Sequence, residues 1–139
     1  MIRVILLDTG PLVALLNRRD RHHAWAVQQL GGLQPPLLTC EAVLSEACFL
    51  LRRSSGGAAA VFRLLERGLI FVGFRLADEA AAVRRLLARF RGVPMSLADA
   101  CLVRLAEIHA EGAVLTLDAG FRVYRKHGRQ VIPTRMPGV

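Results

Sequence analysis

Hydrophobic residues in this chain alternate between short continuous runs and longer stretches in which they recur at helical spacing. The continuous runs are typical of buried strands, and the periodic stretches are typical of helices that cover a sheet. The pattern predicts strands over residues 2–7, 36–39, 69–74, 113–117 and 130–132. It predicts helices over residues 11–17, 20–30, 40–53, 57–67, 77–91, 97–110 and 119–126.

Capping residues mark several of these helix starts. Pro11 suits the first turn of a helix, where its missing N–H is not needed. Asp20, Thr39 and Ser96 are each expected to act as the N-cap of the helix that follows, because their side chains can accept hydrogen bonds from free backbone N–H groups.

Strands that alternate with helices of ten or more residues predict parallel pairing through right-handed crossovers. We therefore expect a three-layer α/β/α architecture with a parallel sheet of about five strands. A chain of 139 residues is the size of one ordinary domain, so we assign residues 1–139 to a single domain.

Composition excludes several other classes of protein. The chain is 53% hydrophobic and 22% charged, which rules out a disordered chain. No apolar run approaches the roughly 18 residues of a membrane helix, and no secretory leader is recognisable at the start. We expect a cytoplasmic protein without a membrane partner. The three cysteines, Cys40, Cys48 and Cys101, are expected to be small buried hydrophobic residues.

The chain is strongly basic. Nineteen Lys and Arg residues oppose eleven Asp and Glu residues, giving a net charge of +8. Such a balance favours a polyanionic partner, although an arginine-rich genome would produce the same composition. Arg122, Arg125, Lys126 and Arg129 form one candidate surface for contacting RNA, and Arg84, Arg85, Arg89 and Arg91 form another. Solvated helix faces are the alternative explanation for both groups, and they suit the second group better than the first.

Acidic side chains fall at particular places in the predicted sheet. Asp8 directly follows the first strand and Asp118 the fourth, while Asp99 lies in the first turn of the helix that leads into the fourth strand. Ligands of open parallel sheets bind outside the carboxyl ends of the strands, so these three aspartates should share one rim. Glu46, on the flank of the helix over residues 40–53, is a further candidate.

Each of these acids also has a purely structural explanation. Ser96 and Asp99 fit a capping box, Asp8 and Asp118 fit turns, and Glu46 fits an ion pair with Arg53. Two carboxylates about 4 Å apart, however, repel by roughly 4 kcal/mol at an effective dielectric constant of 20. Converging acids must therefore share protons or bind a cation, and oxygen ligands of this kind suit Mg²⁺ or Mn²⁺.

An acidic metal site in a cationic protein suggests a phosphodiester substrate. Arginines would hold the phosphate backbone, and a metal held by carboxylates would activate water and stabilise charge on the scissile phosphate. The sequence therefore favours a metal-dependent nuclease.

Four segments resemble the PIN domain, and the length resembles VapC-type toxins of toxin–antitoxin pairs. They are VILLDTGPLVALL at residues 4–16, LSEACFLL at 44–51, MSLADACLVRLAE at 95–107 and LTLDAGF at 115–121. The resemblance implies strand order 3-2-1-4-5 and metal-dependent endoribonuclease activity. Asp8, Glu46, Asp99 and Asp118 match the acidic quartet of the family, and Thr9 and Thr116 match its supporting hydroxyl positions.

The resemblance also implies roles and partners. Asp8 and Asp99 would hold the principal metal, Mg²⁺ or Mn²⁺, with Glu46 acting through water and Asp118 completing the shell or holding a second ion. Many relatives carry another acid just after the last aspartate, where this chain has Ala119 and Gly120, which favours one tightly held ion. A homodimer and an inhibitory antitoxin are implied as well, with contacts around Phe49, Leu50 and Phe62 as one option.

Other classes stay open. A catalytically inactive PIN-like module that binds RNA or protein would carry the same fold, and metal titration would distinguish it. The string Leu7-Asp8-Thr9-Gly10 resembles an aspartic-protease motif, but those proteins are nearly all β. A receiver-like domain would need a lysine near its last strand, where Lys126 lies within a basic cluster.

Overall fold

In the part of the chain that the structure describes, the main sheet has five parallel strands. The computed structural model describes residues 4–138, so the first two residues of the strand expected over 2–7 lie outside it. The strands are β1 (Val4–Leu7), β2 (Leu37–Leu38), β3 (Ile70–Phe71), β4 (Gly112–Leu115) and β7 (Thr134–Arg135), in the order β3-β2-β1-β4-β7. The predicted parallel sheet of five strands, with the first and fourth as neighbours, is confirmed.

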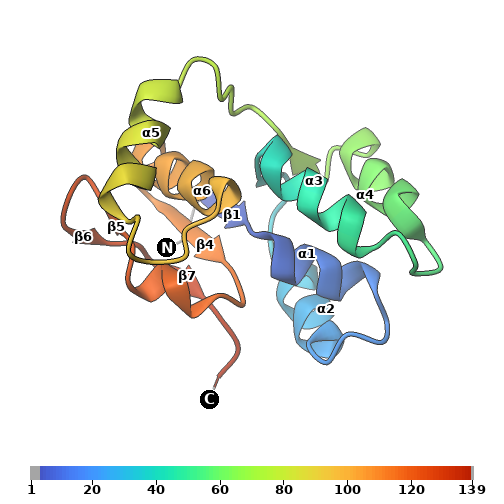
Figure 1. Ribbon diagram of the computed structural model, residues 1–139. Coiled ribbons are helices and arrows are strands. Elements are labelled where there is room, and N and C mark those ends of the chain that lie inside the picture. Colours follow the sequence, from blue (N-terminus) through green and yellow to red (C-terminus); the bar gives the residue numbers. More distant parts are fainter. Residues whose placement is uncertain (1–3, 139) are drawn as a thin grey trace.

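In residues 4–138, six α-helices cover the sheet. The connections between β1, β2 and β3 contain α1 (Thr9–Leu16), α2 (His23–Gly31), α3 (Glu41–Leu50) and α4 (Gly57–Glu66), whereas α5 (Ala80–Arg89) and α6 (Leu97–Ile108) lead from β3 to β4. Right-handed crossovers that run in opposite directions along a sheet place these two groups on opposite faces. Figure 1 shows α1 to α4 grouped together, apart from α5 and α6, which agrees with the predicted three layers.

The C-terminal segment differs from the prediction. The helix expected over 119–126 is a short 3₁₀ helix, η1 (Ala119–Arg122), followed by β5 (Arg125–Lys126), which pairs antiparallel with β6 (Gln130–Val131). His127 and Gly128 take φ angles of 50° and 86°, as a tight hairpin turn requires. The strand expected over 130–132 therefore begins in this ribbon, and β7 supplies the fifth strand of the sheet.

Of the three predicted N-caps, the one at Ser96 is confirmed, and those at Asp20 and Thr39 are wrong. Ser96 and Asp99 form the expected capping box at the start of α6. Asp20 does not cap α2, because its side chain accepts from the backbone N–H of His22 at 2.8 Å in the preceding turn. Thr39 does not cap α3 either. Its buried hydroxyl donates to the carbonyl oxygen of Leu7 at 2.8 Å and so joins the ends of β2 and β1.

The core lies between the sheet and both helical layers. Leu6, Val114 and Leu115 of the two central strands are completely buried. Cys40 and Cys101 are buried in the same core, as expected, and Cys48 is half-buried. Among residues 4–138, no helix has the length and apolarity needed to cross a membrane.

The bond from Thr39 to Leu7 gives a test of this arrangement. Thr39→Val removes the hydroxyl but keeps the shape, leaving a buried carbonyl without this donor. We expect the free energy of unfolding to fall by about 1–2 kcal/mol in urea denaturation. Thr134→Val makes the same change at a half-buried position of β7 and serves as the control. Equal stability of the two variants would contradict the assignment.

Candidate active site

Asp8 lies where the two central strands end. Its backbone N–H donates to the carbonyl oxygen of Leu115 at 3.0 Å, which continues the pairing of β1 with β4 by one residue. One carboxylate oxygen accepts from the N–H of Thr9 at 2.8 Å, so Asp8 is also the N-cap of α1. The other oxygen accepts from the Thr116 hydroxyl at 2.6 Å. Both oxygens of this buried side chain are therefore fixed in position.

Thr116 joins two of the acids. Its hydroxyl, completely buried, donates to Asp8 and accepts from the backbone N–H of Asp118 at 2.9 Å. Asp118 itself is exposed and caps η1, where its side chain accepts from the N–H of Gly120 at 2.8 Å. A single hydroxyl thus couples the orientation of Asp8 to the backbone that carries Asp118.

Asp99 is held by two donors on one oxygen. Its Oδ2 accepts from the N–H of Ser96 at 3.1 Å and from the Tyr124 hydroxyl at 2.9 Å. Tyr124 is buried and packs edge-on against Phe90 and Phe121, with ring centroids 5.5 and 5.2 Å away. The sequence does not reveal Tyr124 as part of the site, because its pattern predicts a helix over residues 119–126. No local motif marks this contact, which depends on the path of the chain after η1.

All four predicted carboxylates line one open cleft of about 390 Å³. Asp8, Asp99 and Asp118 lie at the carboxyl edge of the sheet, and the exposed Glu46 reaches the cleft from α3. Within the described chain Glu46 makes no ion pair, so the pairing with Arg53 considered above is absent. Thr9 lines the cleft too, and its buried Oγ1 has no hydrogen-bond partner in the part of the chain described.

The acids influence one another electrostatically. Burial raises the pKa of Asp8 from 3.8 to about 6, and the charges of Asp99 and Asp118 add to the rise, while the bonds from Thr116 and Thr9 oppose it. Burial also raises the pKa of Asp99, with a contribution from Asp118. The partial loss of hydration of the Glu46 carboxyl raises its pKa, and the charge of Asp99 adds to the rise. A cation bound in the cleft would reduce the repulsion between these carboxylates and lower their pKa values.

The chemistry of the site fits a divalent cation. Its donors are all oxygen atoms, as Mg²⁺ and Mn²⁺ prefer, and the buried Oγ1 of Thr9 marks a polar position that lacks a partner. In residues 4–138, however, no three His, Cys, Asp or Glu side chains are close enough together to form a ligand cluster. The cleft therefore presents suitable donors without a closed set of ligands.

The predicted basic surface near the C-terminus is only partly exposed. Arg122 and Arg129 are exposed, whereas Arg125 is half-buried and its guanidinium bonds to backbone carbonyls at the end of η1. Lys126 is buried, and its ammonium group donates to the carbonyl of Ala110 at 3.2 Å. The Lys126 ammonium group thus binds a backbone carbonyl just after α6. The prediction that Lys126 lies on an exposed surface for RNA is wrong.

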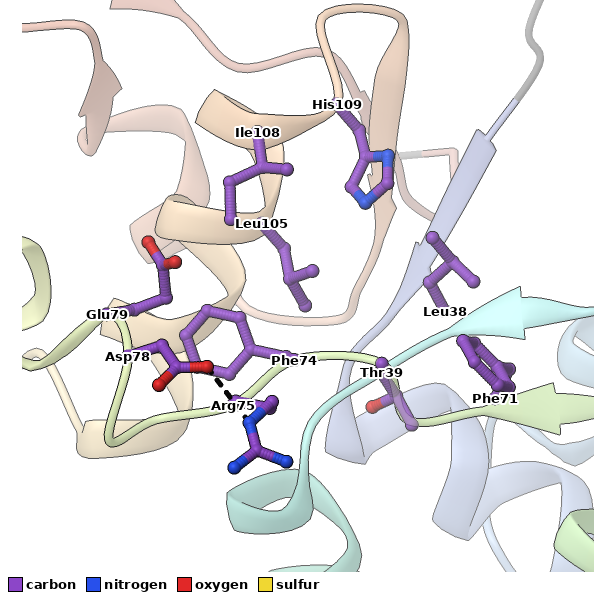
Figure 2. Close-up of a pocket in the computed structure, with 11 residues that line it drawn as sticks. Leu38, Thr39, Phe71, Phe74, Arg75, Asp78, Glu79, Leu105, Ile108 and His109 are labelled. Atoms are coloured by element: carbon purple, nitrogen blue, oxygen red, sulfur yellow. Dashed lines mark hydrogen bonds and ion pairs between the residues drawn. The ribbon is translucent and has the colours of Figure 1, made fainter.

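A second cleft, of about 310 Å³, has different chemistry (Figure 2). Its walls are largely apolar, and Figure 2 shows Phe74 lying between the loop after β3 and Leu105 of α6. Its charged groups are already paired: Arg75 with Asp78 at 2.9 Å, and Glu79 with Arg104 at 2.6 Å. We therefore place the candidate chemistry at the four carboxylates.

The raised pKa of Asp8 predicts how stability depends on pH. With a pKa of 3.8 when unfolded and about 6 when folded, Asp8 favours folding at low pH, and this contribution is lost as the pH rises through 6. In EDTA, Asp8→Asn should therefore raise the free energy of unfolding at pH 7.5 by up to about 3 kcal/mol. The gain should nearly vanish at pH 4. Urea denaturation at both pH values measures it, and a gain independent of pH would contradict the cause.

Comparisons with known proteins identify the family of the chain. A family model, the PIN domain, matches residues 5–127. No curated protein sequence matches the chain.

Solved structures share the fold. VapC20 of Mycobacterium tuberculosis, described as a toxin that cleaves the sarcin–ricin loop, superposes with a TM-score of 0.72 at 24% identity, over 83% of this chain and 90% of that one. DNA-bound VapBC from Salmonella typhimurium gives a TM-score of 0.58 at 18% identity over 98% of both chains. FitAcB from Neisseria gonorrhoeae gives 0.53 at 21% identity, over 84% of this chain and 89% of that one. With the family model covering most of its length, the chain belongs to the PIN domain family.

Proposed function

We propose that the protein is a metal-dependent endoribonuclease that hydrolyses RNA phosphodiester bonds, and that it is the toxin of a type II toxin–antitoxin pair. One observation carries the proposal. Asp8, buried and with its pKa raised to about 6, faces a cleft shared with three further carboxylates in a chain of net charge +8. The fold that it shares with VapC20, described as a toxin that cleaves the sarcin–ricin loop, supports the same conclusion.

Asp8 and Asp99 are the residues that would hold the metal, with Asp118 and Glu46 completing its surroundings. A bound Mg²⁺ or Mn²⁺ lowers the pKa of a water molecule and neutralises charge on the scissile phosphate. Thr116 and the N–H of Thr9 hold the Asp8 carboxylate in place, as Ser96 and Tyr124 do for Asp99. Glu46, exposed and with a raised pKa, is suited to accept the proton of the attacking water.

The proposed partners are RNA, a cognate antitoxin and a second copy of the chain. Large apolar side chains stand exposed on the α2–α4 side of the molecule, among them Phe49, Leu50 and Phe62, which are 55–62% exposed. Exposed apolar groups of this size on neighbouring helices are typical of protein interfaces. They are suited to an antitoxin, while the exposed arginines are suited to RNA.

Cleavage assays test the proposal directly. Purified protein freed of partners should cut RNA with Mg²⁺ or Mn²⁺ and not with EDTA. Asp99→Asn, which can partly keep the cap of α6 but loses the charge, should reduce the rate on the order of a hundredfold. Asp78→Asn makes the same change at an exposed ion pair away from the cleft and should leave the rate unaltered.

Calorimetric titration with Mn²⁺ separates the alternatives. If the protein cleaves none of several RNAs and also binds no Mn²⁺, the proposal is contradicted and an inactive binding module is favoured. The absence of a closed ligand cluster in residues 4–138 is the one observation on the side of that module.

Tyr124 should act on the metal through Asp99. Tyr124→Phe keeps the ring between Phe90 and Phe121 but removes the hydroxyl from Asp99 Oδ2. Because outer hydrogen bonds orient metal-binding carboxylates, we expect Mn²⁺ affinity to fall about tenfold with little change in melting temperature. In an Asp99→Asn background the same change should have no further effect. Unchanged Mn²⁺ affinity of the single variant would contradict this role.

A further inference from the structure

An apolar recess of about 440 Å³ adjoins the carboxylate cleft, and Glu46 lines both. Its walls come from the first turns of α3 and α6 and from the segment that follows β3. The first turn of α6 divides between the two spaces: Ser96 and Asp99 line the cleft, while Leu97 and Ala98 line the recess. A molecule held at the carboxylates therefore has this recess beside it.

The surface of the recess is apolar and open to a ligand. Leu76 and Leu97 are 40% and 45% exposed although both line it. Phe74 and the thiol-bearing Cys40 and Cys101, all buried, form its inner wall. Apolar side chains left exposed around a concavity favour a flat, weakly hydrated group over water.

The polar side chains of the recess come from one helix, and two of the three are carboxylates, which only accept when ionised. Glu41, Ser45 and Glu46 of α3 line it, and no Lys, Arg or His is among its described lining residues. Two carboxylates without a cation repel a phosphate group, so the sugar–phosphate backbone is disfavoured there. Carboxylates accept hydrogen bonds from amino groups on the edges of bases, as in recognition of cytosine N4 by Glu or Asp.

We propose that this recess binds the base of the nucleotide next to the scissile phosphate and selects bases that carry an exocyclic amino group. Leu76 and Leu97 contact the faces of the base, and Glu41 accepts from its amino group. Uracil, with carbonyl oxygens at its edge, is disfavoured beside the carboxylates. The inference rests on the proposed nuclease function and assigns its substrate specificity.

The cleft of Figure 2 is less suited to this role, although Phe74 lines both spaces. There the carboxylate of Asp78 is already bonded to Arg75, as the dashed line in Figure 2 shows. The carboxylate of Glu41 makes no ion pair in the described part of the chain, so it is available to a base.

Sequencing the ends produced from a randomised RNA pool tests the inference. Wild-type protein should cut with a preference for adenine, cytosine or guanine over uracil of about tenfold at one position beside the cut. Glu41→Gln, which offers an amide donor as well as an acceptor, should reduce this discrimination against uracil at that position alone. Leu97→Ala should weaken the preference and lower the cleavage rate for short RNAs, with its metal affinity unchanged.

Matched variants control for indirect effects. Glu66→Gln makes the same change at the exposed end of α4, and Leu69→Ala removes a leucine that is 39% exposed beside β3. Both should keep the wild-type preference. Cleavage with the same base preference in Glu41→Gln and Leu97→Ala as in wild type would overturn the inference and leave the nuclease function intact. Failure of the wild-type protein to cut any RNA would overturn the proposed function, and the inference with it.

Discussion

The parallel pairing of β1 with β4 is the constraint on which the site depends. Leu7 pairs with Leu115, and the backbone bond from Asp8 to Leu115 carries the alignment to the next residue. The Asp8 carboxylate and the Thr116 hydroxyl, 108 positions apart in the chain, thereby come within 2.6 Å. Because side chains alternate between the faces of a strand, a shift of one residue would separate this pair and turn the buried leucines toward the wrong layer. The core and the site thus enforce the same register.

Bringing the acidic side chains together reduces the stability of the folded state. Burial of Asp8 beside other acids raises its pKa despite the hydrogen bonds from Thr116 and Thr9, so the ionised form is disfavoured where it is needed. The apolar contacts of Leu6, Leu7 and Leu115 directly beneath can offset that cost, since burying each such side chain contributes about 1.5–3 kcal/mol. In many proteins the residues that stabilise the core differ from the residues that form the active site, and the latter reduce stability.

The positions of the carboxylates at the edge of the sheet could be predicted from the sequence, but the hydrogen bonds of Tyr124 and Thr39 could not. Asp8 and Asp118 follow continuous apolar runs, and the end of a buried strand is a local feature that one sequence can reveal. Tyr124 and Thr39 could not be found in this way, because each donates to a group that is distant in the sequence. Asp99 lies 25 positions from Tyr124, and Leu7 lies 32 positions from Thr39. The β5–β6 ribbon was missed for a related reason. Its hairpin depends on two residues with positive φ, and the first of them, His127, is not a residue that marks such a turn.

Asp99 shows that a local structural explanation and a functional one need not compete. The capping box accounts for its position in the first turn of α6, so an aspartate here could be explained without any functional role. A cap, however, uses one carboxylate oxygen, and the Tyr124 hydroxyl binds that same oxygen, Oδ2. Within the described residues no hydrogen bond engages Oδ1. The cap therefore fixes the orientation of the carboxylate, and the oxygen it leaves unused is the one that a ligand in the cleft can take.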